Sequence, residues 1–328
     1  MSEIPERNLG LELARVTEAA AIGAARLQGR GDKIAADQAA VDAMRLILTS
    51  IDIDGQIVIG EGEKDEAPML YNGERIGTGK GPKVDVAVDP VDGTSLTAAG
   101  MPGAIAVIAL SEAGTMYSPG SLVYMDKIAV GPPSKGMIDI DAPIAHNLAQ
   151  VAKATEKSVT DVTAIILDRP RNQPYIDAVR AAGGRIRLIT DGDVAGSIAT
   201  AEENSGIDIL LGIGGSPEAV ISAAAMAAMG GEMQCKLWPR DASEKQYAAE
   251  NDHSLTDVLQ MHDLVSGENI FFAATGITTS ELLKGVRFYG QGAETHSVVM
   301  RSKTGSIRCM ETRHDLARLA KISALLDE

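Results

Sequence analysis

Hydrophobic and polar positions in the first half of the chain change periodicity several times. Residues 9–28 and 35–50 place apolar side chains at helical spacing and predict two helices. Residues 84–88 alternate valine with small or polar residues, which is typical of a half-buried strand. Further elements are predicted from the same patterns: strands at 56–60, 104–110, 117–131 and 136–140, and a helix at 144–157. We therefore expect residues 1–160 to form an α+β domain with an antiparallel sheet.

The second half has a different rhythm, because short apolar strands alternate with helical patterns. The predicted elements are strands at 163–167, 185–189 and 207–211, and helices at 172–182, 194–203 and 217–229. This alternation indicates βαβ units and a parallel sheet. The last hundred residues add strands at 270–275 and 294–301 and a closing helix at 314–327. We expect residues 161–328 to form a second, α/β domain, so the chain as a whole is of the α/β class.

Composition limits the cellular compartment and the classes of partner that we expect for this protein. The formal charge is −15 and aromatic residues make up 3% of the chain, whereas nucleic-acid binding needs a basic surface and often stacking rings. The longest apolar run, Ala219 to Met229, is too short to span a membrane. Two cysteines, Cys235 and Cys309, indicate a reducing compartment, and the first residues lack the features of a signal peptide. A cytoplasmic protein without nucleic-acid or membrane partners is predicted.

The exit of the strand at 84–88 carries the most informative chemistry. Pro90 removes a backbone donor and is expected to end the strand. Asp89 and Asp92 flank a tight turn, Gly93 gives it conformational freedom, and Thr94 is expected to cap a following helix. Two carboxylates beside helical N–H groups suit a divalent cation bridged to a phosphate. The alternative is that these residues only terminate a strand, since all are common in turns.

Three more acids stand at the ends of predicted elements. Asp37 falls in the first turn of the second helix, and Glu218 follows Pro217 at the start of another, where an acid also complements the helix dipole. Glu61 follows the strand at 56–60 and opens an acidic run, residues 61–66, that is otherwise typical of a solvated loop.

Charged residues also follow the three predicted parallel strands, whose carboxyl ends meet at one sheet edge where ligands bind. They are Asp168 to Arg171, Asp191 to Asp193, and the glycine-rich stretch Gly212 to Glu218. Arg169 and Arg171 suit a phosphate, which arginine binds bidentately. A dinucleotide site fits poorly, because the glycines do not follow the G-x-G-x-x-G spacing. Asp191 and Asp193 also resemble the nucleophile motif of aspartyl-phosphate phosphohydrolases, which leaves a rival mechanism open.

Several chemistries are disfavoured. The loop at 77–83 mimics a phosphate loop, but Gly81 stands where a serine or threonine is required. The five histidines show no zinc spacing, and neither cysteine begins the loop expected of a cysteine phosphatase.

Six motifs in order resemble the class II fructose-1,6-bisphosphatases of bacteria, over about residues 9–300. They are Gly31 to Gln38, Ile59 to Glu63, Asp89 to Thr94, Asp168 to Arg171, Asp191 to Asp193, and Gly212 to Glu218. The third motif alone is shared with the wider superfamily of lithium-sensitive sugar and inositol phosphatases. The resemblance implies a layered αβαβα sandwich with the active site between its two domains.

The resemblance also implies roles for individual residues. The implied metal ligands, for Mn²⁺ or Mg²⁺, are Asp37, Glu61, Asp89, Asp92 and Glu218. The implied substrate contacts are Asp92, Gly93, Thr94, Tyr124, Arg169, Pro170, Arg171, Asp191, Gly192, Asp193 and Gly215. Some relatives have Glu in place of Asp92, and Lys33 matches a motif without an assigned step. A homo-oligomer, a dimer or a tetramer, is implied as well.

The mechanism expected from this likeness is hydrolysis of the 1-phosphate of D-fructose 1,6-bisphosphate to fructose 6-phosphate, a gluconeogenic step. Thr94, held by a nearby carboxylate, assists a metal-activated water, with Asp89 and Glu61 also counted as catalytic. Arg169 and Arg171 hold the distal phosphate, and Asp191 and Asp193 accept sugar hydroxyls. A dual fructose-1,6-/sedoheptulose-1,7-bisphosphatase, an inositol-monophosphatase-like enzyme and a non-catalytic sugar-phosphate sensor stay open as alternatives.

Overall fold

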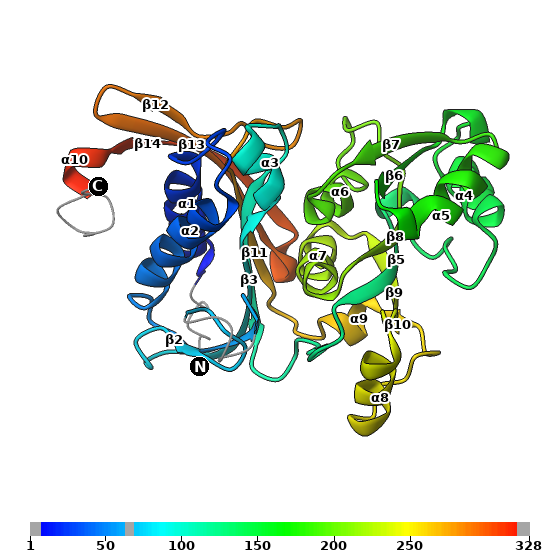
Figure 1. Cartoon of the computed structure of the whole chain (residues 1–328), viewed down its shortest axis with the longest axis horizontal. Helices are drawn as coiled ribbons and strands as arrows, with labels where there is room; N and C mark the ends of the chain where they lie inside the picture. The colour runs from blue at the N-terminus through cyan, green and yellow to red at the C-terminus, as the bar shows by residue number, and fades with distance from the viewer. Residues whose placement is uncertain (1–7, 63–68, 320–328) are drawn as a thin grey trace, which may run out of the picture.

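The computed structural model describes residues 8–62 and 69–319, which form alternating layers of helix and sheet (Figure 1). From one side to the other the layers are a helix pair, a sheet, a central helix layer, a second sheet and an outer helix pair. The α/β class and the layered αβαβα arrangement are thereby confirmed. Within the described ranges, no helix is long and apolar enough to cross a membrane.

The first sheet has eight strands: β1 (Asp54–Ile59), β2 (Arg75–Ile76), β3 (Lys83–Asp92), β4 (Ile105–Glu112), β11 (Phe271–Gly276), β12 (Arg287–Tyr289), β13 (Gly292–Arg301) and β14 (Ser306–Asp315). Their order is β12-β13-β11-β4-β3-β1-β2, with β14 paired to β13, and only β1 and β3 run parallel. Helices α1 (Gly10–Ala25) and α2 (Lys33–Leu48) cover the outer face, where Leu13, Met44 and Val86 belong to one buried cluster.

The second sheet has six strands: β5 (Tyr124–Val130), β6 (Thr163–Leu167), β7 (Arg185–Ile189), β8 (Ile209–Gly215), β9 (Glu232–Leu237) and β10 (Leu259–Gln260). Their order is β10-β9-β5-β8-β6-β7. Strand β6 runs parallel to β7 and β8, as the βαβ rhythm predicted, but β5, β9 and β10 pair antiparallel. Helices α4 (Ile144–Ala154) and α5 (Gln173–Ala181) pack on the outer face.

The central layer joins the two sheets. Helices α6 (Asp193–Ala199) and α7 (Ser216–Met229) lie between them, and Val107 of β4, Met125 of β5 and Ala224 of α7 share one buried cluster. The remaining helices are α3 (Thr94–Ala99), α8 (Ala242–Glu250), α9 (Met261–Leu264) and α10 (Leu316–Leu319). Short 3₁₀ turns occur at Pro132–Ser134, Val159–Asp161, Pro170–Asn172 and Ser302–Thr304. The two sheets therefore share one apolar core through the central helices.

Sheet membership does not follow the expected division of the chain at residue 160. Strand β5 precedes that point but lies in the second sheet, and β11 to β14 follow it but lie in the first. In particular, β11 pairs antiparallel with β4, so that Thr275 stands opposite Ala106. Alternation of apolar residues specifies a strand and its buried face, but it does not specify the distant partner.

Some element bounds also differ from the prediction. The strand expected at 117–131 begins only at Tyr124, residues 136–140 form no strand, and α6 ends at Ala199 instead of 203. The second sheet is mixed because the returning strands β5 and β9 supply its antiparallel neighbours. Residues 63–66 of the acidic run lie outside the described residues. Most of the closing helix expected at 314–327 also lies outside them, and its first two positions belong to β14.

Candidate active site

Two adjoining cavities of about 610 and 290 Å³ open between the sheets. Both are lined by Asp92, Asp191, Pro217 and Glu218, so they form two parts of one cleft. The larger part also contains Asp37, Glu61, Asp89, Gly93 and Thr94, and the smaller part Tyr124, Arg169, Arg171, Asp193 and Gly215. Of the residues selected from the sequence, Pro170 and Gly192 line neither part, although Gly192 lines a neighbouring cavity.

The turn after β3 is built by a bulge. The strand does not end at Pro90: pairing with β4 stops at Asp89, skips two residues and resumes at Asp92. The proline has no N–H to give to the ladder, and the bulge lets the strand pass it. The Asp89 carboxylate accepts a hydrogen bond from the Val91 N–H at 3.0 Å, which fixes its direction at the bulge.

Helix α3 begins differently from the prediction. Gly93, not Thr94, is the residue before the helix, and its φ of 104° is in the left-handed region that favours glycine. A Cβ at Gly93 would also lie 3.2 Å from the Cα of Ala104. Thr94 is the first helical residue, and its hydroxyl donates to the Val91 carbonyl at 3.3 Å. The expected carboxylate partner of Thr94 is therefore replaced by a backbone carbonyl.

Two acids reach the cleft from α2 and from the end of β1. Asp37 lies in the second turn of α2, because the helix begins at Lys33 after its cap, Asp32. Asp32 accepts a hydrogen bond from the Ala35 N–H and so stabilises the start of the helix. The alternative role considered for Asp37, an acid that complements the helix dipole in the first turn, therefore falls to Asp32. Glu61 follows β1 and lies partly buried at the cleft wall instead of in a solvated loop.

Glu218 enters from the opposite sheet, in the first turn of α7. Its carboxylate lies against the backbone of Gly215, where an added Cβ would be 1.8 Å from Oε2. The buried oxygens Oε2 of Glu218 and Oδ2 of Asp92 have no hydrogen-bond partner. Buried carboxylate oxygens are normally bonded, so this pair is suited to a cation.

The electrostatics of the acids point the same way. Burial, together with the charges of Asp37 and Glu218, raises the pKa of Glu61 to about 8. Burial and the charges of Asp92 and Glu218 raise the pKa of Asp89 well above its usual value. Burial also raises the pKa values of Asp37 and Glu218. Carboxylates that repel one another in an enclosed space favour protonation or a bound cation.

The smaller part of the cleft carries the positive charge. Arg171 donates from Nε to the Ile213 carbonyl at 3.1 Å, and its guanidinium lies 4.1 Å from the centre of the Tyr124 ring. Arg240 lies 5.9 Å from the same ring, and Arg169 is partly buried at the cleft wall. A guanidinium fixed by stacking keeps its remaining donors free for an anion.

The turn between β7 and α6 holds two acids in different surroundings. Asp191 lines both parts of the cleft, whereas Asp193 is buried and accepts a hydrogen bond from Lys127 Nζ at 2.7 Å. The sequence interpretation missed Lys127, and it also missed Arg240 and Ser95. Ser95 accepts from Lys33 Nζ at 2.8 Å, which brings Lys33 to the edge of the larger cavity. A lysine inside the apolar strand 124–130 was the one available signal for Lys127.

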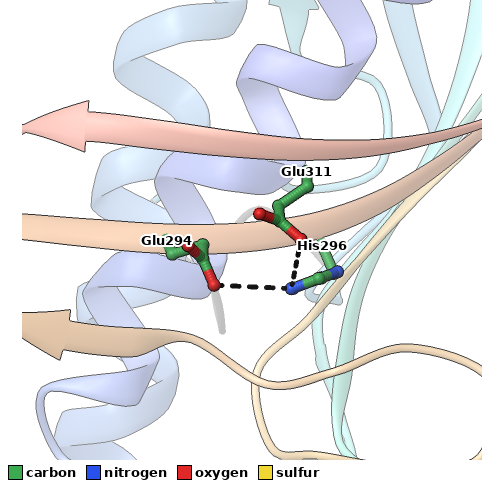
Figure 2. A group of neighbouring side chains, drawn as sticks. All are labelled: Glu294, His296 and Glu311. Carbon is green, nitrogen blue, oxygen red and sulfur yellow. Dashed lines mark ion pairs between the residues drawn. The ribbon is translucent and has the colours of Figure 1, made fainter.

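A second group of side chains could hold a metal, but it lies elsewhere. Glu294, His296 and Glu311 come together on β13 and β14, as Figure 2 shows, three strands from β3 in the first sheet. The Glu294 carboxylate already receives Arg287 at 3.1 Å and Arg313 at 3.5 Å. Because these two cations neutralise it, we do not place the catalytic metal there.

The similarity of this chain to known proteins covers both sheets. Residues 7–314 match the family described as bacterial fructose-1,6-bisphosphatase, glpX-encoded. The chain is similar to the fructose-1,6-bisphosphatase class 2 of Haemophilus influenzae, with 44% identity over 329 residues, 96% of this chain and 98% of the relative. It is also similar to the fructose-1,6-bisphosphatase 1 class 2 of Escherichia coli, with 43% identity over 325 residues, 95% of this chain and 96% of the relative. These matches include every residue of the cleft.

Proposed function

This chain belongs to the family of glpX-type bacterial fructose-1,6-bisphosphatases, and from that premise we propose that it hydrolyses the 1-phosphate of D-fructose 1,6-bisphosphate. The products are fructose 6-phosphate and inorganic phosphate. The observation that carries the assignment is the cleft itself, with unpaired acids in one part and arginines beside Tyr124 in the other. A substrate with two phosphates on one sugar fits both parts at once.

The donor set suits Mn²⁺ or Mg²⁺ held by Asp37, Glu61, Asp89, Asp92 and Glu218. When bound, such cations neutralise phosphate oxygens and lower the pKa of water. The two buried oxygens without partners, on Asp92 and Glu218, support this ligand assignment. Asp89 is held in direction by the Val91 N–H, so it can act as a fixed ligand at the bulge.

Thr94 handles the attacking water in this proposal. Its hydroxyl donates a hydrogen bond to the Val91 carbonyl, so the hydroxyl oxygen can still accept a hydrogen bond from water. Asp92, Gly93 and Thr94 bind the phosphate that is removed, at the start of α3, where backbone N–H groups have no helical partner. Phosphoryl transfer depends mainly on such positioning and charge stabilisation.

The sugar and the distal phosphate are bound by the other wall. Arg169 and Arg171 hold the 6-phosphate, and Asp191, Asp193 and Gly215 face the sugar. The positioned guanidinium of Arg171 supports this orientation of the substrate. We also propose a cytoplasmic location, from the two unpaired cysteines, and a homo-oligomer, from the family likeness.

A phosphate-release assay over a panel of substrates tests the proposal. Fructose 1,6-bisphosphate, sedoheptulose 1,7-bisphosphate, fructose 1-phosphate and inositol 1-phosphate are each assayed with and without Mn²⁺. We expect the fastest metal-dependent release from fructose 1,6-bisphosphate. Equal rates for the heptulose would indicate the dual enzyme, binding without turnover would indicate a sensor, and a phosphoryl group trapped on Asp191 would establish the rival covalent mechanism.

A further inference from the structure

Lys127 is a fully buried charge next to the acidic cleft. It lies in β5 with 1% of its surface exposed, in a layer that also contains the buried Met125, Ala129 and Cys235. Its Nζ donates to Asp193 Oδ2 at 2.7 Å, and Asp193 begins α6 on the other side of β8. A buried ammonium is tolerated only when it is paired, so loss of the Asp193 contact would leave an uncompensated charge inside the protein.

The contact passes beside Gly214 of β8. A Cβ at Gly214 would lie 2.0 Å from Asp193 Oδ2 and 2.9 Å from Lys127 Nζ, so any side chain there would displace the ion pair. The neighbouring Gly215 leaves the same kind of room for the Glu218 carboxylate. The glycine-rich stretch therefore makes space for charged side chains behind the cleft, instead of cradling a dinucleotide.

The ammonium also acts on two acids of the cleft. Asp193 lines the smaller cavity together with Asp92 and Glu218, both of which have a buried oxygen without a partner. Burial lowers the pKa of Lys127, but the charges of Asp193 and Glu218 and the hydrogen bond to Asp193 raise it, and the pKa ends above its usual value, so Lys127 stays charged. Burial and neighbouring acids raise the pKa values of Asp92 and Glu218, and the charge of Lys127 counteracts part of that rise.

We propose that Asp193 is a positioning residue that holds the Lys127 ammonium away from the unpaired oxygens of Asp92 and Glu218. This inference rests on the proposed function, because it takes Asp92 and Glu218 as metal ligands. Without Asp193, the lysine is left buried without its ion-pair partner, while its charge still acts on Asp92 and Glu218. It then competes with the divalent cation for them, so Asp193 supports metal binding without touching the metal.

The test is a double-mutant cycle read by Mn²⁺ titration of metal-free protein in a calorimeter. Asp193→Asn should weaken Mn²⁺ binding about tenfold or more, because an unpaired buried charge then faces the ligands. The double variant Lys127→Met with Asp193→Asn removes both charges and should recover Mn²⁺ affinity to within about threefold of the original. Lys127→Met alone should lower the melting temperature without weakening Mn²⁺ binding, because it leaves a buried carboxylate unpaired.

A matched control is the Lys157–Asp208 pair, whose Nζ and Oδ1 lie 2.5 Å apart and which does not line the cleft. Asp208→Asn should lower the melting temperature and leave Mn²⁺ affinity unchanged. A double variant that binds Mn²⁺ as poorly as Asp193→Asn would overturn the proposal, since Asp193 would then act on the metal directly. The titration needs no sugar phosphate, so a protein that binds Mn²⁺ but does not hydrolyse fructose 1,6-bisphosphate contradicts only the proposed function.

Discussion

The two walls of the cleft differ in whether their acids have basic side chains beside them. The wall built on the first sheet presents Asp37, Glu61, Asp89 and Asp92, and among the described residues none of these acids makes an ion pair. The wall built on the second sheet presents Arg169 and Arg171 at the surface. Asp193 also lines this second wall, and the buried Lys127 pairs with it from behind. In the part of the chain that the structure describes, the acids of the first wall have no basic ion-pair partners, whereas the second wall combines acids with arginines and a buried lysine.

This difference indicates a division of labour. Acids that stand together without basic partners bind a cation that comes from solution, because their mutual repulsion is relieved only then. Guanidinium groups fixed by stacking and backbone contacts are ready for an anion before it arrives. The first wall therefore depends on metal, and the second wall determines which phosphorylated sugar is accepted.

Removal of metal should have the largest effect. Dialysis against excess EDTA should lower phosphate release from fructose 1,6-bisphosphate by about 10³-fold or more, because the charge stabilisation supplied by the ions is worth several kcal/mol. Added Mn²⁺ or Mg²⁺ should restore the rate. Full activity in excess chelator would contradict the assignment of the acidic wall to metal.

Thr94→Ala should have the second-largest effect, because it removes the side chain proposed to orient the water. We expect kcat to fall by about 10²- to 10⁴-fold, the usual contribution of a proton-handling group, with little change in KM. Thr94→Ser keeps the hydroxyl and is the matched control, so it should retain most of the rate. An alanine variant that works normally would mean that another group handles the water.

The acidic wall was predictable to the extent that its signals are local. Asp89, Pro90 and Asp92 specify a strand end close to Thr94. The structure differs in adding a bulge and in placing Gly93, not Thr94, before the helix. Asp37 shows nothing locally that distinguishes a ligand from a helix-dipole acid, whereas Glu61 stands out by its position at the exit of a strand. The resemblance alone implied that both are metal ligands, and the structure brings both into the cleft.

The arginine wall was predictable because the carboxyl ends of parallel strands share one edge, and β6, β7 and β8 are indeed parallel. The role of Lys127 was not predictable. Its partner Asp193 is 66 residues away, and the contact exists only because β5 inserts antiparallel beside β8. Such pairings are set by the packing of the whole core, as is the return of β11 to β14 into the first sheet.

Arg171→Ala tests the second wall and should affect binding more than turnover. Loss of a charged hydrogen-bond donor to the distal phosphate should raise the KM for fructose 1,6-bisphosphate by about 10- to 100-fold. The KM for fructose 1-phosphate, which lacks that phosphate, should not change. Arg185→Ala is a matched control, since Arg185 donates to the Asp161 carbonyl and does not line the cleft. Equal losses for both substrates would place the distal phosphate elsewhere.

The smallest effect expected is on the stability of the metal-free protein, and it arises from the buried acids of the cleft. Burial and the neighbouring acids raise the pKa of Glu61 to about 8, so folding favours its protonated form. That contribution to the free energy of unfolding is complete below the unfolded pKa of about 4.3 and is lost as pH rises through the folded value. The melting temperature of the metal-free protein should therefore fall by several degrees between pH 5 and pH 8. Glu61→Gln should weaken this dependence and Arg171→Ala should not, because the loss of stability comes from the ionisation of buried carboxylates.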